Sequence, residues 1–544
     1  MTDIEEVPKC FYLKKCPTTG PALRMHMVAS HMDGPRKTCG VCPHNTAGSA
    51  VDEIPDENVK DVFADAKSFP IIDPYGPMLE VEQLSAMRKE VNKTRNQIID
   101  IMKGGKMPDL PPLARYNFAN EKTEGADYTA GSVKPSHLIA NPEVDKIMLP
   151  LIEKAVALVK SETTDMKYEP VTANGFDTYC DPERFAKEVE YFRTNFLYCG
   201  VSSDVERKNA FARVEMNGKS ILLTRDADKN FHAFENVCRH RGMEVVTKER
   251  PRGNAQVHVC PYHSWAYGSN GDLLNVPFSK GFENNDKVDL KNRNLIPLPC
   301  AEVAGTLWVV SHPDYNAKNY EELVKDILNE QLQKEFDAFN VGKNYAVVTQ
   351  EMRLSCNWKL PIDTFGEAYH FKSLHPLLQK IFMRNRMLFR EFNDTNGNEK
   401  NSCMVLLQST VQLMADGDIP KSKWLTPSGV SHALPTYMLN PNTSFIVNPR
   451  GITVTQAFPT DKPGECIVRM TQYSDSNPAG FDKEQRKGIA AGFGNFLDIV
   501  ATEDFEILAK MHRSFQESPH AETVFGRNEP ALIYRHKMFL NMLK

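Results

Sequence analysis

Two short motifs near the middle of the chain carry side chains that bind metals. Cys238 and His240 form a Cys-x-His motif, and Cys260 and His263 form a Cys-x-x-His motif after a gap of 19 residues. Two thiolates and two imidazoles can make four metal bonds, to zinc or to an iron–sulfur cluster. Zinc sites mostly pair like residues, whereas here each motif supplies one Cys and one His. That layout favours a [2Fe–2S] cluster with two Cys on one iron and two His on the other, and a zinc ribbon is the alternative.

A second constellation lies further along the chain. His370 and His375 are five residues apart, so they cannot share one face of a straight helix with 3.6 residues per turn. We expect a helix over Asp363–His370 and a bend at Pro376 that lets both imidazoles reach one metal. Two His and one carboxylate form the facial triad of non-haem Fe(II) oxygenases, which keeps positions open for O₂ and substrate. Acidic residues within 501–506 are candidates for the carboxylate.

The elements that must position these motifs change along the 544 residues, and a chain of this length predicts two or three domains. Residues 1–165 form an irregular N-terminal extension with helical spacing at Val81–Met102 and Pro150–Lys160. Residues 168–315 contain short apolar runs separated by turns and predict an all-β domain. Residues 316–544 mix helices and strands, which predicts an α+β domain.

The first motif falls among predicted strands and the second among mixed elements. The predicted strands of the β-rich part are Phe211–Met216, Ser220–Thr224, Phe231–Phe234, Val257–Val259 and Thr306–Val310. Asn217-Gly218 and Asn270-Gly271 are hairpin signals. In the C-terminal part the sequence predicts helices at Tyr320–Phe336 and Gln485–Lys510, and strands at Ala346–Arg353 and Gly451–Phe458.

The β-rich part resembles the Rieske domain of the ring-hydroxylating oxygenases. The flanking residues agree, with Arg241-Gly242 after the first motif and Trp265 after the second. Two departures are an insertion at Lys248–Gln256 and a serine, Ser264, where the family usually has Gly. The resemblance implies that the [2Fe–2S] cluster is bound by Cys238, His240, Cys260 and His263.

The segment that begins with Asn357-Trp358-Lys359 resembles the catalytic domain of the same family. Its Tyr-His-x-x-x-x-His pattern implies that His370 and His375 bind the mononuclear iron. In the family an acidic pair opens a C-terminal helical segment. This makes Asp504 the implied third ligand, with Glu503 as the runner-up.

Glu367 stands where many members of the family have Asp, and there the carboxylate links a cluster ligand to an iron ligand. A carboxylate between two imidazoles accepts both ring N–H groups and orients them, so the implied role of Glu367 is an electron bridge between the two centres. Glu at this position occurs in some members that act on quaternary ammonium compounds such as carnitine and choline. Thr364 replaces the Asn that is frequent in ring dioxygenases, which counts against a naphthalene-type substrate.

The resemblance covers residues 168–520 and implies an α+β multidomain fold: a Rieske domain before a helix-grip (START-like) catalytic domain. It also implies a head-to-tail homotrimer, with electrons passing from His240 or His263 of one subunit through Glu367 to an iron ligand of its neighbour. The implied cofactors are the [2Fe–2S] cluster and mononuclear Fe(II), with O₂ as co-substrate.

The implied activity is mono- or dioxygenation of a small organic substrate, with an aromatic one favoured. Quaternary ammonium monooxygenation of the choline or carnitine type and N- or O-demethylation are alternatives, and an electron-transfer protein without oxygenase activity is a third. Recognition of a cation would need an aromatic cage or an acidic pocket, and sequence alone does not place the aromatic residues around a substrate.

Motifs and composition limit the classes of partner that we expect for this chain. No G-x-G-x-x-G motif follows a strand, so we expect NAD(P)H to act only through a separate reductase, with or without a ferredoxin. A net charge of −5 without a long single-sign run argues against nucleic-acid binding. There is no run of 18 apolar residues and no secretory signal pattern, so we expect no membrane span and a cytoplasmic location.

Twelve Cys in such a chain predict metal ligation and buried thiols rather than a disulfide framework. Four of them, Cys10, Cys16, Cys39 and Cys42, lie in the N-terminal extension close to several His. A small zinc site is one reading of this group, and ordinary thiols in a flexible arm are the favoured reading. The role of residues 1–165 is left open.

Overall fold

The computed structural model describes residues 136–282, 289–315, 317–375, 382–478, 481 and 483–543. These residues lie in the second of the two compact units into which the chain divides, residues 128–544. The helix predicted at Val81–Met102 lies outside the described residues. So does the possible zinc site of Cys10, Cys16, Cys39 and Cys42.

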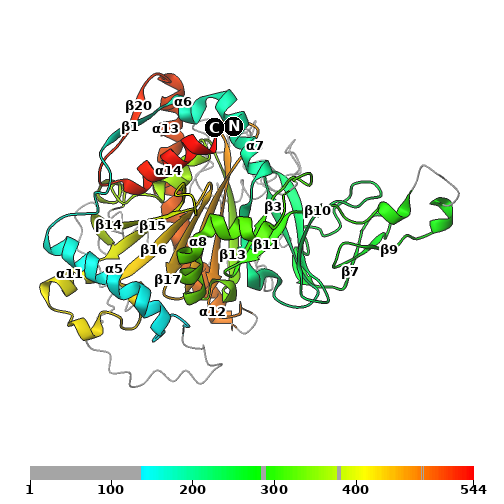
Figure 1. The fold of residues 1–544 in the computed structure, drawn as a ribbon, viewed down its shortest axis with the longest axis horizontal. Helices are drawn as coiled ribbons and strands as arrows, with labels where there is room; N and C mark the ends of the chain where they lie inside the picture. Colours follow the sequence, from blue (N-terminus) through cyan, green and yellow to red (C-terminus); the bar gives the residue numbers. More distant parts are fainter. Residues whose placement is uncertain are drawn as a thin grey trace, which may run out of the picture. The chain divides into compact units, whose positions relative to one another are not determined.

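An antiparallel sheet of seven strands is the centre of the C-terminal part (Figure 1). Its strand order is β13-β19-β18-β17-β16-β15-β14. The bounds are Tyr345–Leu354 (β13), Phe382–Asn393 (β14), Glu399–Gln408 (β15), Ala433–Leu439 (β16), Thr443–Asn448 (β17), Gly451–Pro459 (β18) and Cys466–Ser474 (β19). Every residue of β16 and β18 is buried. Because successive side chains of a strand point to opposite faces, both faces of the sheet are covered there.

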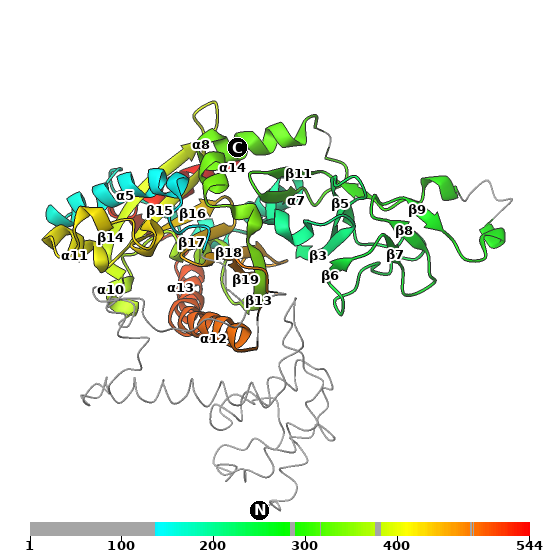
Figure 2. The same ribbon diagram turned by 90° about the horizontal axis from the view of Figure 1, so that it is seen from below.

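Helices lie on both sides of this sheet, with α5 and α8 on one side and α12 and α13 on the other (Figure 2). The helix bounds are Pro142–Lys160 (α5), Asp177–Cys180 (α6), Pro182–Thr194 (α7), Tyr320–Ala338 (α8), Lys359–Thr364 (α9), Phe371–Leu374 (α10), Thr410–Asp416 (α11), Lys483–Ile499 (α12), Glu506–Glu517 (α13) and Pro530–Met542 (α14). Within the described part of the chain, no helix has the length and apolar character needed to cross a membrane.

Two helices predicted from sequence periodicity are confirmed. The pattern at Tyr320–Phe336 belongs to α8, and the pattern at Pro150–Lys160 belongs to α5. α5 begins earlier than predicted, because the side chain of Asn141 caps it and accepts a hydrogen bond from the backbone N–H of Glu143 (3.0 Å). α5 packs against α11 and β14 of the C-terminal part, so this piece of the predicted N-terminal extension covers the seven-stranded sheet.

The helix predicted over Gln485–Lys510 is not continuous. α12 ends at Ile499, a π-helical segment spans Val500–Phe505, and α13 continues from Glu506. Wide turns of this kind are rare inside α-helices and frequently occur at functional sites. The buried Asp504 lies inside this segment.

The β-rich part consists of three small antiparallel sheets, with strand orders β10-β5-β4-β3-β6, β11-β12-β2 and β7-β8-β9. Their bounds are Leu197–Val201 (β2), Ala210–Met216 (β3), Lys219–Arg225 (β4), Phe231–Glu235 (β5), Arg252–Asn254 (β6), Val257–Val259 (β7), Ala266–Gly268 (β8), Leu273–Asn275 (β9), Pro297–Leu298 (β10), Cys300–Val303 (β11) and Thr306–Val309 (β12). The five strands predicted here are confirmed as β3, β4, β5, β7 and β12. The β7–β9 sheet lies at the end of this part away from the seven-stranded sheet (Figures 1 and 2).

The hairpin predicted at Asn217-Gly218 is confirmed. Met216 of β3 pairs with Lys219 of β4, so the turn contains two residues. Asn217 and Gly218 have φ angles of 53° and 72°, and two positive φ angles are what a type I′ turn requires.

One hydrophobic core joins the β-rich and C-terminal parts. Its buried residues include Leu197 and Ile221 from the small sheets and Met438 and Val468 from the large one. The segment before the small sheets also contacts the C-terminal part, because β1 (Val171–Gly175) pairs antiparallel with β20 (Glu522–Phe525). The predicted domain boundaries at 165, 168 and 315 stay a prediction.

Candidate metal centres

A turn, and not a helix, leads to the first candidate iron ligand. The predicted helix over Asp363–His370 is wrong, because α9 ends at Thr364 and α10 begins only at Phe371. Helix α14 packs tightly against the break: a Cβ on Gly366 would lie 2.9 Å from Leu532 Cδ2. The glycine therefore permits an approach that a longer side chain would block.

Glu367 holds the rest of this turn. Its carboxylate accepts hydrogen bonds from the backbone N–H groups of Tyr369 and His370, the latter at 3.1 Å. The other carboxylate oxygen accepts a hydrogen bond from His370 Nδ1. A side chain that satisfies three local donors competes with helical hydrogen bonding, which is why the segment departs from the predicted helix.

Three of the predicted site residues meet at the end of this turn. His370 Nε2 lies 3.1 Å from His375 Nε2. Asp504 Oδ1 lies 3.2 Å from His375 Nε2 and 3.5 Å from His370 Nε2. His375 and Asp504 are buried, and His370 is partly exposed. Three ligand atoms from two distant segments of the chain, His370 with His375 and Asp504, thus lie within 4.8 Å of one another.

This set of donors fits a metal ion. Asp504 Oδ1 is buried, and within the described residues it has no partner in hydrogen-bonding geometry, although the two imidazole nitrogens are close. Burying a carboxylate oxygen without a partner costs free energy, and a cation bound between the three atoms would remove that cost. Two His and one carboxylate are the protein ligands of mononuclear non-haem iron.

A carboxylate also binds the outer ring nitrogen of each imidazole. His370 Nδ1 donates to Glu367, and His375 Nδ1 donates to Glu503 Oε2 (2.6 Å). Such contacts fix the tautomer and direction of a ligating imidazole. The geometry therefore gives Glu503, the runner-up for the third ligand, a different place: beside the far nitrogen of His375 rather than among the converging atoms.

A cavity of about 420 Å³ opens beside the three candidate ligands. Strands of the large sheet form one wall and α12 with the π-helical segment forms the other. Its lining is mostly apolar and includes Met404, Leu434, Ile446, Phe493, Phe496 and Val500. A largely apolar cavity of this size with a few polar groups is typical of a site for a small organic molecule.

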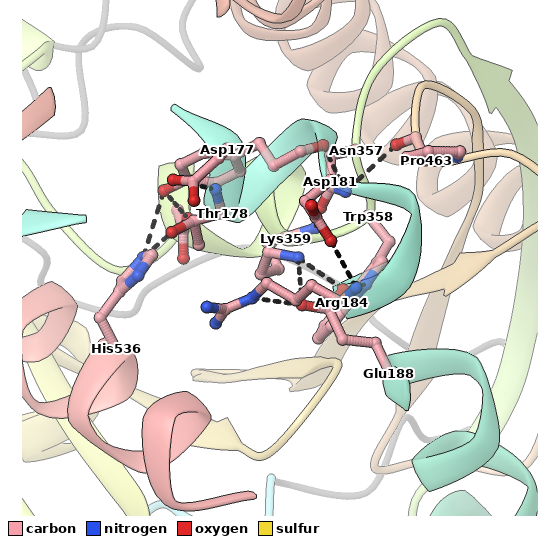
Figure 3. Close-up of polar contacts among 12 residues, drawn as sticks. Asp177, Thr178, Asp181, Arg184, Glu188, Asn357, Trp358, Lys359, Pro463 and His536 are labelled. Carbon is pink, nitrogen blue, oxygen red and sulfur yellow. Dashed lines mark hydrogen bonds and ion pairs between the residues drawn. The ribbon is translucent and has the colours of Figure 1, made fainter. Parts of the chain in front are cut away.

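Buried charges fasten the start of α9. Lys359 donates to both carboxylate oxygens of Glu188 on α7, at 2.7 and 2.6 Å, and Trp358 Nε1 donates to the same carboxylate at 2.9 Å (Figure 3). Arg184 Nε donates to it as well (3.1 Å). Burial lowers the pKa of Lys359 to about 8, although Glu188 acts in the opposite direction. The Asn-Trp-Lys motif thus ties α9 to α7.

A second buried network holds the other end of α9. Asp363 accepts hydrogen bonds from Arg535 Nε (2.9 Å), His536 Nε2 (3.2 Å) and the Tyr179 hydroxyl (3.2 Å). Burial opposes ionisation of Asp363, but His536 and Arg535 together lower its pKa below the usual value. With both ends fixed, α9 presents the following turn and its ligands in one orientation.

We expect Glu188→Gln to destabilise the protein by about 3–5 kcal/mol, because it leaves the Lys359 ammonium buried without an opposite charge. The double variant Glu188→Leu/Lys359→Met should recover part of that loss, since it removes both of these charges but leaves Trp358 Nε1 and Arg184 Nε without their acceptor. Glu190→Gln is the matched control: it changes an exposed pair with Arg193 and should cost less than about 1 kcal/mol. Urea unfolding followed by circular dichroism measures all three, and equal losses in the single and double variants would contradict the expectation.

The four predicted cluster ligands lie on two loops, one after β5 and one between β7 and β8. Cys238 and Cys260 are buried, and burial together with the neighbouring Cys238 thiol raises the pKa of Cys260. The rings of His240 and His263 are 4.5 Å apart. His240 Nδ1 is buried and has no hydrogen-bond partner among the described residues. Two thiols and two imidazoles from two facing loops fit a [2Fe–2S] cluster bound by two Cys and two His.

Ser264 adopts the conformation that explains why Gly is usual at this position in the resembled family. Its φ is 59°, in the left-handed region, which costs a residue with a side chain on the order of 1 kcal/mol. The turn is held by hydrogen bonds from Ser264 N to Cys260 O (3.0 Å) and from Cys260 N to Trp265 O (2.8 Å). The Trp265 ring then stacks on His240, with centroids 5.0 Å apart.

One residue beside the site, Arg450, is not predicted from the sequence. Arg450 lines the cavity from the turn between β17 and β18. Nothing in its local sequence distinguishes Arg450 from other turn cations, because its place depends on how β17, β18 and β19 pair. Among the aromatic residues near the motif, Phe365 and Phe371 line the cavity, whereas Tyr369 is exposed.

Two family models match the chain. Residues 195–292 match the Rieske [2Fe-2S] domain. Residues 336–544 match the catalytic domain of the ring hydroxylating alpha subunit.

Curated relatives include oxygenase subunits named for an aromatic substrate and for quaternary ammonium substrates. The large oxygenase component of salicylate 5-hydroxylase from Ralstonia sp is 30% identical over 37% of this chain and 48% of the relative. The oxygenase subunit of glycine betaine monooxygenase from Pseudomonas aeruginosa is 29% identical over 38% of this chain and 45% of the relative. The oxygenase subunit of carnitine monooxygenase from Escherichia coli K12 is 30% identical over 36% of this chain and 50% of the relative. The chain thus spans about half the length of the curated relatives it matches.

Solved structures share the fold over more of the chain. A quaternary ammonium Rieske monooxygenase in complex with gamma-butyrobetaine superposes with a TM-score of 0.53 at 19% identity, over 68% of this chain and 95% of that one. A naphthalene 1,2-dioxygenase mutant bound to phenanthrene superposes with a TM-score of 0.51 at 18% identity, over 68% and 92%. At such identities the likeness concerns the fold alone.

Proposed function

Because the chain belongs to the ring-hydroxylating alpha subunits of the Rieske non-haem iron oxygenases, we propose that it oxygenates a small organic substrate, with a quaternary ammonium compound as the preferred class. The family's cofactors are a Rieske [2Fe–2S] cluster and a mononuclear iron. When bound, the iron supplies O₂ activation and the cluster supplies electrons one at a time.

One observation carries the proposal: His370, His375 and Asp504 converge at the wall of a largely apolar cavity. In our assignment these three residues would hold the iron beside the cavity, and the iron would supply the O₂ activation there. The apolar wall excludes water and positions a C–H bond of the substrate near these three residues. Glu503 and Glu367 orient the two imidazoles through their outer nitrogens.

We also assign to Glu367 the link between the two centres. Its carboxylate accepts a hydrogen bond from His370 Nδ1, and the residue is partly exposed. The β7–β9 sheet, next to the Cys260 loop, lies away from the seven-stranded sheet (Figures 1 and 2), which supports electron delivery from a neighbouring subunit. The proposed assembly is a head-to-tail homotrimer, served by a separate reductase with or without a ferredoxin.

The preference for a quaternary ammonium substrate has two supports. The glycine betaine and carnitine monooxygenase subunits are among the relatives. The family resemblance also associates a Glu at position 367 with some enzymes that act on quaternary ammonium compounds. Hydroxylation of an N-methyl group yields an unstable product that loses the methyl carbon, so the net reaction is demethylation. An aromatic substrate is the second candidate, supported by the salicylate 5-hydroxylase component and by the apolar cavity wall.

Iron content and turnover test the proposal together. Anaerobically reconstituted protein should contain about three irons per chain, two in the cluster and one mononuclear, whereas an electron carrier would contain about two. With a surrogate reductase and NADH, glycine betaine, carnitine and salicylate should be screened for product formation and O₂ uptake. Without reductase, NADH should support no turnover. A protein with only two irons and no product from any of the three substrates would refute the function.

A further inference from the structure

Arg450 is a positively charged residue at the cavity wall, and the proposed function gives it no role. It lies in the two-residue turn between β17 and β18, and it is the only Lys or Arg among the described residues that line the cavity. Its carbonyl oxygen accepts a hydrogen bond from Asp475 N (3.1 Å). The Asp475 carboxylate accepts a hydrogen bond from the Ser476 hydroxyl through Oδ1 (3.2 Å), and its buried Oδ2 has no hydrogen-bond partner among the described residues. Within the described part of the chain, the Arg450 guanidinium has no hydrogen-bond or ion-pair partner.

The cavity is polar where Arg450 borders it. Asn448, Thr453, Gln472 and Ser474 line this end, on strand ends that pair side by side. Asn448 Nδ2 donates to Thr453 Oγ1 (3.3 Å), and Thr453 Oγ1 donates to Gln472 Oε1 (2.8 Å). Asn448, Thr453 and Gln472 are therefore bonded to one another, and Arg450, whose side chain is exposed at the rim, is the charged lining residue at this end.

The candidate iron site lies at a different part of the same cavity. Phe371, next to His370, packs against the cluster of apolar residues that includes Leu434 and Ile446. Arg450 follows Ile446 by four residues along β17 and its turn, which corresponds to on the order of 10 Å. A small elongated molecule can therefore lie with one end beside the imidazoles and the other within reach of the long arginine side chain.

The charges of the cavity lining determine which class of substrate the cavity can bind. A substrate whose only charge is positive would meet Arg450 as a like charge, and the carboxylates in the lining, Glu367 and Asp504, are engaged at the metal end. A carboxylate on the substrate would instead form a charge-assisted, bidentate pair with the guanidinium.

We propose that Arg450 binds a carboxylate group of the substrate. The cavity then selects small acids or zwitterions over neutral or purely cationic compounds. In a zwitterion, the carboxylate faces Arg450 and the methylated ammonium lies toward Phe365 and Phe371, whose rings attract cations. The reaction that follows rests on the proposed function, whereas the binding step does not.

Binding to the holoenzyme without reductase tests this assignment. Isothermal titration compares 4-(trimethylammonio)butanoate with its methyl ester and salicylate with salicylamide, so that each pair differs in the carboxylate. The carboxylate member of at least one pair should bind the wild type about 10- to 100-fold more tightly than its neutral-group analogue, which is the range expected for a charge-assisted hydrogen bond. In Arg450→Gln the preference should disappear. Affinity for the neutral salicylamide should stay unchanged, and affinity for the cationic ester should stay the same or rise, because a like charge is removed.

Two further variants sharpen the test. Arg450→Lys keeps the charge but not the bidentate geometry, so it should retain part of the preference. Arg193→Gln, which alters a surface arginine on α7, should behave as wild type. Equal affinity of wild type and Arg450→Gln for both carboxylates, or no binding of either carboxylate by the wild type, would overturn the assignment. Loss of the preference in Arg450→Gln, in a protein that contains only two irons and forms no product from any of the three screened substrates, would keep the assignment and refute the proposed function.

Discussion

Asp504→Ala is expected to lose the mononuclear iron and to abolish oxygenation while the [2Fe–2S] cluster stays in place. Asp504 supplies the only carboxylate oxygen among the three converging atoms, so its removal leaves two imidazoles. The loss of activity should exceed the roughly 10- to 100-fold that removal of an outer-shell residue causes. Iron analysis should fall from about three to about two per chain, with the electron-resonance signal of the reduced cluster unchanged.

Glu503→Gln is the matched control for that variant, because it alters the adjacent acid. It weakens the hydrogen bond to His375 Nδ1 but leaves all three converging atoms. We expect it to keep most of the mononuclear iron and to lose activity by about 10- to 100-fold. If the Glu503 variant lost the iron and the Asp504 variant kept it, Glu503 would be the ligand.

Glu367→Gln is expected to retain both metal centres and to lose at least about 10- to 100-fold in turnover. The carboxylate of Glu367 already accepts from His370 Nδ1 and from two backbone N–H groups. An amide has one acceptor oxygen in place of two, so it cannot hold this turn and also accept from a second imidazole. The loss should therefore appear in electron delivery to the iron site.

Single-turnover kinetics separate this role from a structural one. In enzyme reduced beforehand, oxidation of the cluster after mixing with O₂ and substrate should be slow in Glu367→Gln, while reduction of the cluster by the reductase keeps its normal rate. Glu367→Asp restores the charge with one methylene less and should recover part of the rate. Normal cluster oxidation in Glu367→Gln would exclude a role in electron delivery.

The sequence predicts those parts of the fold that depend on local patterns. The hairpin at Asn217-Gly218 follows from two residues that adopt positive φ readily, and α8 follows from apolar spacing over Tyr320–Phe336. The strands beside the cluster loops and the strands β13 and β18 follow from alternating or apolar runs between turn residues. These signals lie within a few residues of the element they predict.

The parts of the fold and of the site that the sequence does not predict depend on contacts between distant segments of the chain. The helix expected up to His370 fails because Leu532, from the last helix, packs against Gly366, and because Glu367 binds local N–H groups. The choice between Glu503 and Asp504 as the third ligand depends on where His375 lies relative to these acids, and Glu503 is 128 residues further along the chain. Arg450 reaches the cavity only through strand pairing, which no local pattern encodes.

The π-helical segment has a consequence for these two adjacent acids. In an ordinary α-helix each residue advances about 100° around the axis. Glu503, seven residues after the cavity-lining Phe496, would then point in nearly the same direction as Phe496. Asp504 would point about 80° away from that direction. One additional residue in the wide turn brings Asp504 into that direction and moves Glu503 to the flank, beside the outer nitrogen of His375. Closing this turn to an ordinary α-helical turn at constant chain length would exchange the two carboxylates, whereas deleting one residue from it would keep Asp504 in place. The width of this turn thus determines which of the two acids lies beside His370 Nε2 and His375 Nε2, where we propose that the iron binds.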